Sequence, residues 1–321
     1  MRYLARRALH GAFLLIAVSV LSFVLAGIAP GDYFSQMRLD PRVSASAVDS
    51  MRSNAGLDRS LPVRYIRWAA SVARGDLGWS LAYNGPVSPL VWPRLRATLL
   101  LTGTATLLAW LVALPLGVWA AARRGTWRDG AVSAFLALLL SVPDLLLAIV
   151  FLAFAVRTGR FPAGGMTSAD FPSLGAAARA RDILRHLALP AAALALGMLP
   201  VLARHVRASM LEAMDSPFAL SARAQGIPRL RLLFRHLLPA ALNPLISLFG
   251  FSLGTLLSAA LLIEVVMGWP GLGPLFLEAI VARDFALALA VVMLSTAFLA
   301  AGNLVADILL YRADPRIRLR G

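Results

Sequence analysis

Few side chains in this 321-residue sequence could carry out covalent or metal chemistry. All 31 Lys and Arg positions are Arg, and the absence of Lys excludes a nucleotide-binding P-loop, whose Lys contacts the terminal phosphates of ATP. Cys is also absent, so neither a disulfide nor a thiolate metal site can form. The sequence predicts no catalytic residue, no metal site and no cofactor, and any ATP hydrolysis is expected on a separate chain. The only imidazoles are scattered along the chain, at His10, His186, His205 and His236.

One acidic residue interrupts a long apolar run. Asp144 follows Pro143 near the middle of the run from Gly130 to Val156. An ionised side chain at the centre of a bilayer costs about 3 kcal/mol on insertion scales, so Asp144 should face a cavity or a partner. Two interpretations stand: Asp144 lines a path through the protein and meets a cationic group there, or it is a protonated or hydrogen-bonded structural residue beside the Pro143 break.

A second distinctive segment is the polar loop 204–240, in which both ends of a short helix are marked. Ser216 before Pro217 is an N-cap signal, and Gly226 with Pro228 is a stop signal. The predicted helix, Pro217 to Gln225, is too short to be stable alone in water. It must therefore dock, either on a partner through its small residues and the anchor Phe218, or on the spans of its own chain.

The composition shows which elements must position these residues. Apolar residues make up 59% of the chain, charged residues 15%, and the mean hydropathy is +0.75. A soluble domain carries about 25% charged residues, so an ordinary cytosolic enzyme is excluded. A spanning helix needs about 20 apolar residues. With Gly130 to Val156 counted, six runs predict an all-α polytopic membrane protein with six transmembrane helices. The other five are bounded by Arg7 and Asp32, Arg96 and Arg123, Arg185 and Arg204, Arg235 and Glu264, and Asp284 and Asp307.

The distribution of Arg predicts that both termini are cytoplasmic. With the N-terminus inside, inner segments hold 16 Arg against four acids, and outer segments hold 15 Arg against ten. Nine of the outer Arg lie in the segment from Pro30 to Arg96, which is long enough to translocate regardless of charge. The net charge of +15 is thus accounted for by membrane topology, and no aromatic-basic surface for nucleic acid is recognisable. A cleaved signal peptide is the alternative for the first run, although that run exceeds the usual apolar length.

Several smaller features complete the predicted organisation. The segment from Pro30 to Arg96 should form a small ordered subdomain on the outer face, with a short helix around Tyr65 to Trp68 near the interface. Asn303 and Asp307, four apart on the last span, should make a polar contact between helices. The predicted regions are 1–93, comprising the first helix and the extracytoplasmic segment, 94–311, comprising the other five helices, and 312–321, a cytoplasmic tail. An interfacial aromatic belt is expected at Trp68, Trp79, Tyr83 and Trp92.

The loop 204–240 resembles the cytoplasmic EAA coupling loop of ABC importer permeases. Leu220 stands where the general motif has Glu, Phe218 where the resembled branch has Tyr, and Gln225 where it has Lys. In that family the loop inserts a short helix into a groove of the ATPase subunit. The resemblance assigns the coupling role to Phe218, Ser221, Ala222, Arg223, Ala224, Gln225, Gly226, His236 and Pro239.

The resemblance extends almost end to end and is closest to the B-type subunit of the dipeptide, oligopeptide and nickel permease branch. It implies the type I importer permease fold and a multi-pass protein of the bacterial inner membrane. It also implies four kinds of partner: a second homologous permease, two cytoplasmic ABC ATPases, an extracytoplasmic solute-binding protein, and membrane lipid. Part of an outer gate is expected at Glu264, Trp269, Pro270 and Gly271. Other matching motifs are Pro30-Gly31-Asp32, Gly56-Leu57-Asp58, Gly75-Asp76-Leu77-Gly78, Ser80, Arg283-Asp284 and Asp314-Pro315-Arg316.

Two other classes of function are weighed against this expectation. An ion-coupled secondary transporter would show intramembrane charges and broken helices, and Asp144 and Asp307 are the two residues that point that way. A non-transporting assembly subunit would not need a coupling helix. Within the importer interpretation, peptides are the expected substrate, and nickel, glutathione and other small solutes remain open.

Overall fold

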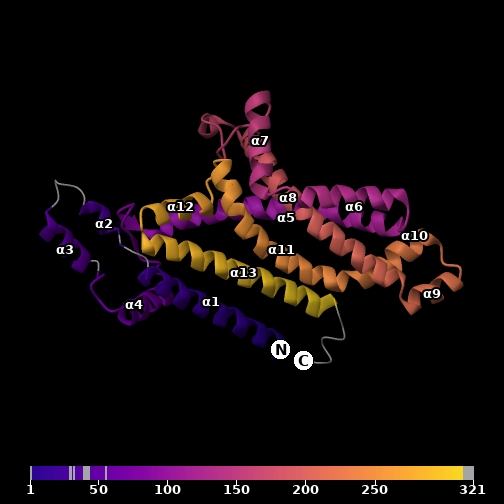
Figure 1. The fold of residues 1–321 in the computed structure, drawn as a ribbon, viewed down its shortest axis with the longest axis horizontal. Helices are drawn as coiled ribbons and strands as arrows, with labels where there is room; N and C mark the ends of the chain where they lie inside the picture. Colours follow the sequence, from indigo (N-terminus) through magenta and orange to yellow (C-terminus); the bar gives the residue numbers. More distant parts are fainter. Residues whose placement is uncertain (1, 29–30, 32, 39–43, 55, 314–321) are drawn as a thin grey trace. The chain divides into compact units, whose positions relative to one another are not determined.

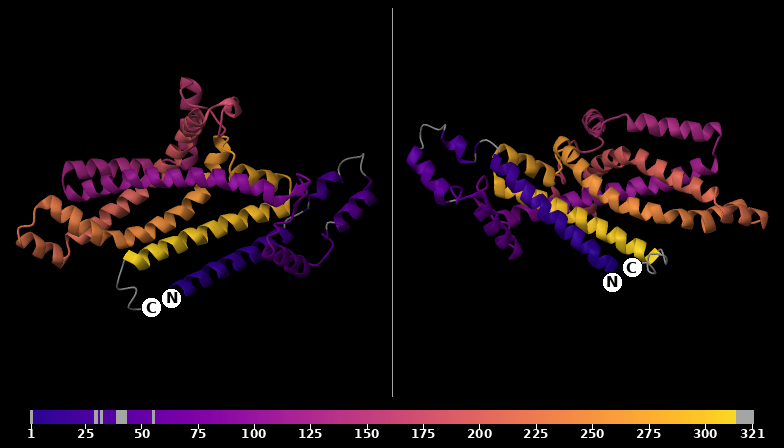
Figure 2. Two further views of the ribbon diagram at one scale, coloured as in Figure 1. Left: turned by 180° about the vertical axis from the view of Figure 1, so that it is seen from behind. Right: turned by 60° about the horizontal axis from the view of Figure 1, so that its bottom comes forward.

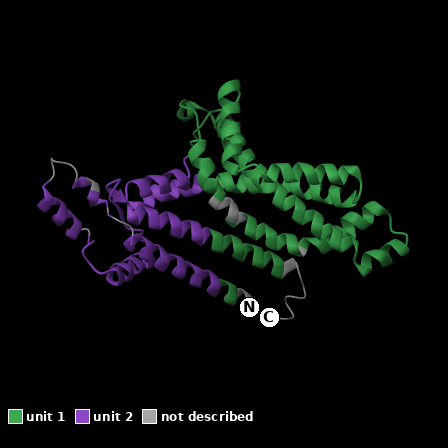
Figure 3. Cartoon of the chain, viewed as in Figure 1, with its two compact units in different colours: residues 1–8, 98–269, 299–321 green, residues 9–97, 270–298 purple. Residues whose placement is uncertain are grey.

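The computed structural model describes residues 2–28, 31, 33–38, 44–54 and 56–313, and these are mostly helical (Figure 1). The expected tail motif Asp314-Pro315-Arg316, and Pro30 and Asp32 of the first outer motif, lie outside the described residues. The chain divides into two compact units (Figure 3). Unit 1 comprises residues 1–8, 98–269 and 299–321, and unit 2 comprises residues 9–97 and 270–298.

Unit 1 is built around the long helix α8 (Ala176–Met214), which packs against α6 (Trp127–Leu140), α7 (Asp144–Thr158) and α11 (Leu238–Val266). Two thirds of the most apolar stretch of α8 is buried. This helix contains Pro190 and Pro200, which a membrane helix tolerates because neighbouring groups satisfy the carbonyls that Pro leaves unpaired. Helix α8 thereby provides the surface on which the rest of unit 1 is assembled.

The predicted span from Gly130 to Val156 is not one straight helix. Helices α6 and α7 are separated by residues 141–143 and meet at 90° (Figure 1). Pro143 has an extended backbone (φ −60°, ψ 142°), and a Pro disfavours helical geometry in the residue before it. Asp144 therefore begins α7, whereas the sequence places it near the middle of a span.

The six predicted spans agree with the structure if bent helix pairs are counted as single spans. Four helices among the described residues are long and apolar enough to span: Arg6–Ile28, Val87–Ala122, Ala176–Met214 and Phe285–Tyr311. Two bent pairs raise the number to six. The first is α6 with α7, and the second runs from Arg229 to Ser252 with a bend of 58°.

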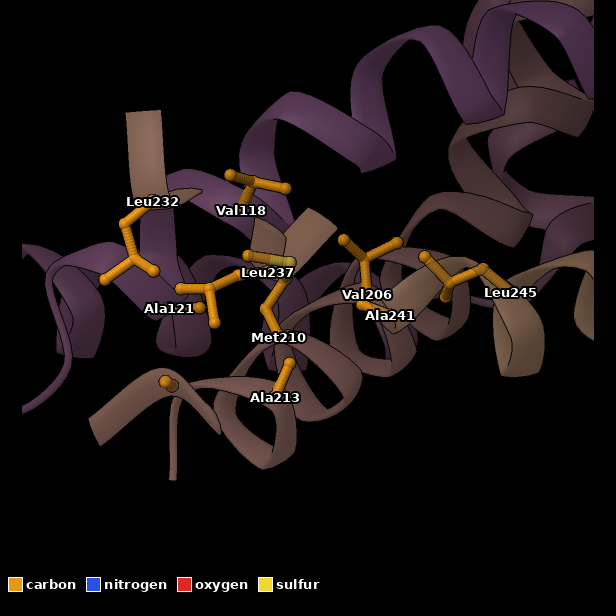
Figure 4. Close-up of a cluster of buried hydrophobic side chains, with 10 residues drawn as sticks. Val118, Ala121, Val206, Met210, Ala213, Leu232, Leu237, Ala241 and Leu245 are labelled. Atoms are coloured by element: carbon orange, nitrogen blue, oxygen red, sulfur yellow. The ribbon is translucent and has the colours of Figure 1, made fainter. Parts of the chain in front are cut away.

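One end of unit 1 is closed by short elements that follow α8 (Figure 2). These are α9 (Pro217–Ala224), α10 (Arg229–Leu232) and the π-helical segment η2 (Leu233–Leu237), which continues into α11. They enclose a core with α5 (Val87–Ala122) and α8, in which Met210 is fully buried (Figure 4). Helices α5 and α8 approach closely because residue 117 is Gly: a Cβ there would lie 2.7 Å from the Ala203 carbonyl oxygen.

Unit 2 contains residues 9–28 of α1 (Arg2–Ile28), the start of α5, and residues 285–298 of α13 (Phe285–Ala313). The segment between α1 and α5 folds into α2 (Phe34–Met37), α3 (Ala45–Asn54), α4 (Leu61–Ala73) and an antiparallel pair, β1 (Trp79–Ser80) with β2 (Gly85–Pro86). The short helix predicted around Tyr65 to Trp68 is confirmed as part of α4. Phe23 of α1 holds α4 in place, with its ring centroid 5.2 Å from both Tyr65 and Trp68.

A buried carboxylate joins the β-hairpin to the last helices of unit 2. Asp284 is 1% exposed and lies between α12 (Leu272–Val281) and α13. It accepts hydrogen bonds from the Ser80 hydroxyl at 2.6 Å, the Ala82 amide at 3.0 Å and the Leu287 amide at 3.1 Å. The same carboxylate therefore caps α13 and positions the hairpin, which gives a structural role to Ser80 and Asp284 of the expected motifs.

Candidate functional site

Helix α9 occupies the position predicted for a coupling helix. It begins at Pro217 after Ser216, whose backbone is extended (φ −72°, ψ 151°), and ends at Ala224, so its predicted bounds are correct to within one residue. Gly226 stops it with a left-handed backbone (φ +73°), and no atom lies within 4 Å of the position that a Cβ would occupy. Backbone conformation, and not lack of space, requires Gly at this position.

The two faces of α9 have different environments. Ala219 is fully buried in the core shared by α5, α8, α10 and α11, and Ala222 packs partly buried against it. On the other face Phe218 is 44% exposed and Leu220 is 58% exposed. The structure thus agrees with the interpretation that α9 packs on the spans of its own chain, here through Ala219 and Ala222, and its other face presents an exposed apolar surface. The other exposed residues expected to couple are Ser221, Arg223, Ala224, Gln225, Gly226, His236 and Pro239.

Several arginines of the loop 204–240 make contacts within the chain. Arg207 binds Asp129 through two hydrogen bonds of 2.7 Å, and Asp129 is 6% exposed. Arg229 donates to the Ala122 carbonyl, and Arg223 donates to the Met214 carbonyl at 3.3 Å. The Arg207 guanidinium is therefore held by a carboxylate of its own chain. Three other arginines of the loop are exposed: Arg204, Arg231 and Arg235.

Two exposed apolar residues of this surface are absent from the sequence-based prediction. Leu230 in α10 is 71% exposed, and Phe234 in η2 is 58% exposed. Leu230 and Phe234 are four residues apart in a basic stretch, and this spacing was the signal that could have placed them on one face of a helix. The buried Leu232 and Leu237 of the same stretch point into the core, and this difference became evident only with the helix bounds.

Asp144 is half-buried in the first turn of α7, where the helix dipole favours a carboxylate. Its carboxylate lies against Gly197 of α8, at a point where a Cβ on residue 197 would overlap its Oδ1 atom. Only Gly at residue 197 leaves room for this side chain. Sequence reasoning identified Asp144 but had no signal for Gly197.

The expected outer-gate residues differ in their exposure. Glu264 and Trp269 are fully buried, Gly271 is buried and Pro270 is half-buried. The Thr98 hydroxyl donates to Glu264 Oε1 at 2.6 Å, and the Trp269 amide donates to the Glu264 carbonyl at 2.8 Å. The turn is further tied by the Gly165 amide, which donates to the Gly268 carbonyl at 3.1 Å. These contacts hold the turn in a defined conformation.

Asp307 and Tyr83 each make a polar contact with another element of the chain. Asp307 pairs with Arg7 of α1 at 3.3 Å, which confirms the predicted contact between helices, whereas Asn303 is exposed. Tyr83, expected in an aromatic belt, donates to Glu278, and this hydrogen bond raises the pKa of the Tyr83 phenol. In the described part of the chain, no group of three or more His, Asp or Glu residues could hold a metal ion.

An apolar body of long helices and a short polar-loop helix with an exposed face define a polytopic membrane protein with a candidate docking helix. The chain belongs to the family of inner membrane components of binding-protein-dependent transport systems: residues 113–319 match that family model, and residues 1–102 match the model of the N-terminal part of the membrane component. This family confirms the resemblance seen in the sequence.

Curated relatives match over nearly their whole length. The chain is 33% identical to the oligopeptide transport system permease protein AppB of Bacillus subtilis, over 98% of each chain. It is 30% identical to the oligopeptide transport system permease protein OppB of Mycobacterium tuberculosis, over 99% of each chain. Among solved structures, the fold is similar to an inward-facing MetNI methionine ABC transporter, with a TM-score of 0.57, 21% identity, and coverage of 70% of this chain and 96% of that one.

The chain is therefore the membrane-spanning permease subunit of an ATP-driven importer and not an enzyme. Its ATPase is a separate subunit, and it works with ATPase and binding-protein partners. It is a multi-pass protein of the inner membrane. No finding supports the ion-coupled alternative.

Proposed function

We propose that this chain forms half of a translocation path for peptides and transmits ATP-driven movement through α9. The observation that carries the proposal is the division of α9 into a face packed on α5, α8 and α11 and a face that exposes Phe218 and Leu220. A rigid helix with one attached face can transmit a push from a partner to the spans beneath it. The relatives named for oligopeptide transport support a peptide as the substrate.

Membership of the family of binding-protein-dependent transport systems supports the partners in this proposal. A second homologous permease completes the path, two cytoplasmic ATPases bind the α9 surfaces, and an extracytoplasmic solute-binding protein delivers the substrate. Both termini lie in the cytoplasm, on the side of α9. Residues 94–311 form the permease domain, and residues 1–93 add the first helix and the extracytoplasmic segment.

Electrostatic pairing within the loop supports α9 as the moving contact. The Asp129–Arg207 pair fixes α6 to α8, and the Arg124–Asp215 pair fixes the end of α5 to the end of α8 at 2.7 Å. These pairs connect the helices behind α9 to one another, the buried Asp129 pair more strongly than the exposed Asp215 pair. The exposed Arg204, Arg231 and Arg235 are then available to acidic groups of the ATPase, which steer association.

Asp144 lines the path in this proposal and attracts the cationic amine of a peptide. Its position at the bend between α6 and α7, against Gly197, supports this role. Uptake of a cationic and of a neutral peptide by Asp144→Asn separates the two interpretations. Loss of uptake confined to the cationic peptide indicates charge recognition, and equal loss for both indicates a structural role.

The experiment that tests the whole proposal is purification of the tagged chain from its native membrane in a mild detergent. Mass spectrometry then identifies every stoichiometric partner. We expect a second permease, one or two ATPases and a binding protein. Recovery of the chain without an ATPase would contradict the assembly.

Reconstitution in liposomes tests the substrate and the coupling together. Uptake of a radiolabelled oligopeptide should require two additions. ATP must be present on the side of the membrane that holds the ATPase, and the purified binding protein must be present on the opposite side. A variant with Phe218 and Leu220 replaced by Ala tests coupling in the same assay, because it changes only the exposed face of α9. Uptake driven by an ion gradient in the absence of ATP would refute the proposed mechanism.

A further inference from the structure

Unit 1 contains a groove of about 310 Å³ where α5 ends and α6 begins. Trp119 contributes to it from the last turn of α5, and the other lining residues come from α6. Arg128 is the one charged residue of the described lining, and the rest are apolar or aromatic. The lining consists of Trp119, Trp127, Arg128, Ala131, Val132 and Phe135.

The floor of the groove is built by the packing of α5 and α6 on α8. Leu136 of α6 and Ala113 of α5 are buried in one cluster with residues of α8, and Val132 packs against that cluster. The rims of the groove are open, because Trp127 is 78% exposed and Phe135 is 52% exposed. The groove therefore combines a packed floor with exposed aromatic rims.

The groove lies at the end of a span. The apolar helix Val87–Ala122 ends shortly after Trp119, and the turn that follows carries the exposed Arg123 and Arg124. Trp side chains concentrate where helices leave the hydrocarbon core, since the indole has an apolar body and a polar N–H group. Farther along α6, Leu138 is 69% exposed, so the groove continues into an apolar face of the next span. One end of the groove is therefore polar and the other end faces hydrocarbon.

Arg128 places a positive charge at the polar end of the groove. Its guanidinium carbon lies 5.7 Å from the centroid of the Trp127 ring, which is a cation–π contact. The adjacent acid, Asp129, accepts two hydrogen bonds of 2.7 Å from Arg207 and one of 3.2 Å from the Gly125 amide. Adjacent residues of a helix do not face each other, so Asp129 belongs to the packed side of α6 and Arg128 to the open side.

We propose that this groove binds one anionic phospholipid, with an acyl chain between the aromatic rims and the phosphate at Arg128. A guanidinium matches the geometry of phosphate oxygens, and basic pockets between spans bind anionic headgroups. The acyl chain covers the exposed rings of Trp127 and Phe135, which removes apolar surface from water at the interface. A soluble phosphate would engage the charge alone and would leave the apolar groove open.

The test uses the complete transporter complex in phosphatidylcholine nanodiscs that contain a small fraction of a lipid with a photoactivatable diazirine on its acyl chain. The labelled lipid is either phosphatidylglycerol or phosphatidylcholine. After illumination, peptide mass spectrometry measures the labelling of residues 119–135. We expect phosphatidylglycerol to label this segment about fivefold more than phosphatidylcholine does, which is the preference that one Arg near a membrane surface provides.

Two variants separate the charge of the groove from its shape, and each has a matched control. Arg128→Gln should remove the preference and leave labelling by phosphatidylcholine unchanged. Arg181→Gln changes an exposed Arg outside the groove and should keep the preference. Ala131→Phe fills the groove and should lower labelling by both lipids severalfold. Ala134→Phe, at an exposed position of α6 that does not line the groove, should leave the labelling unchanged.

Three results would overturn the proposal. Equal labelling by the two lipids in the natural chain would make the groove an ordinary lipid-facing surface. Absence of labelling by either lipid would show that another subunit covers the groove. Loss of labelling in millimolar glycerol phosphate would assign Arg128 to a soluble phosphate. If Arg128→Gln does not assemble, the comparison of the two lipids on the natural chain still decides the question.

The inference depends on the membrane-spanning helices and not on the peptide substrate or on α9. Failure of peptide uptake would leave it standing, and equal labelling by the two lipids would leave the coupling role of α9 unchanged.

Discussion

Phe218→Ala should weaken the contact with the ATPase while leaving the fold of the chain intact. The side chain is 44% exposed, which for a Phe of about 200 Å² leaves about 90 Å² for a partner to cover. At about 25 cal/mol per Å² this area contributes about 2 kcal/mol to binding. A loss of that size weakens affinity about 30-fold. The residues beneath α9 are unchanged, so the unfolding temperature should stay close to that of the natural chain.

The assay measures binding of the purified ATPase to the permease pair in nanodiscs, together with ATP-dependent uptake in liposomes. Phe135→Ala in α6, where the Phe is 52% exposed, is the matched control for loss of an exposed aromatic ring away from the coupling surface. The reasoning is refuted by an ATPase affinity within twofold of the natural chain, or by an equal loss in the control.

The opposite face of α9 should respond in the opposite way. Ala219→Leu adds a larger side chain to a position that is fully buried among the cluster residues. Overpacking of this kind costs about 1–3 kcal/mol. The unfolding temperature in detergent should therefore fall, and unchanged stability would show that α9 is loosely attached.

Three further predictions concern the residues around these sites. Gly226→Ala places a Cβ on a residue with a left-handed backbone and should destabilise the loop by about 1–2 kcal/mol. Faster proteolysis after α9 would report this loss, and an unchanged rate would show that the helix does not end at this residue. Asp129→Asn should lower the free energy of unfolding by about 2 kcal/mol, because it weakens two charged hydrogen bonds to Arg207. Asp215→Asn removes an exposed ion pair and should lower it by less than about 1 kcal/mol. Equal losses in the two variants would contradict this reasoning. Gly197→Ala should displace Asp144 and lower the unfolding temperature, and Asp144→Ala in the same chain should restore it; additive losses would show that the two residues do not touch.

Local signals in the sequence were sufficient for the short helix of the loop. Pro217 can begin a helix but cannot continue one, and Gly226 can adopt the left-handed backbone that ends it, so the two residues define α9 without help from the rest of the chain. Composition was sufficient for the membrane class, because long uncharged runs have few other environments. The ordered motifs were sufficient for the family.

The partners of individual charged residues could not be predicted in this way. Arg207 and Arg204 look alike in the sequence, yet Arg207 meets Asp129, 78 positions earlier, and Arg204 is exposed. The 90° bend at Pro143 could not be predicted either, because a Pro in an apolar run is compatible with a kinked span or with a broken one. The bend changes Asp144 from a mid-span residue to the start of a helix.

A cavity of unit 2, whose described lining includes six arginines, shows the same division. The excess of Arg between the first two spans is visible in the sequence. It is equally consistent with a polar translocated segment in which these residues do not lie close together. Only the packing of α4 on Phe23 and the placement of Arg283 beside Gly31 gather these charges around one space. Short-range rules determine where this chain turns, starts and spans, because they depend on neighbouring residues. Pairing and enclosure depend on residues far apart in the sequence, such as Arg7 and Asp307, and the tertiary structure alone decides them.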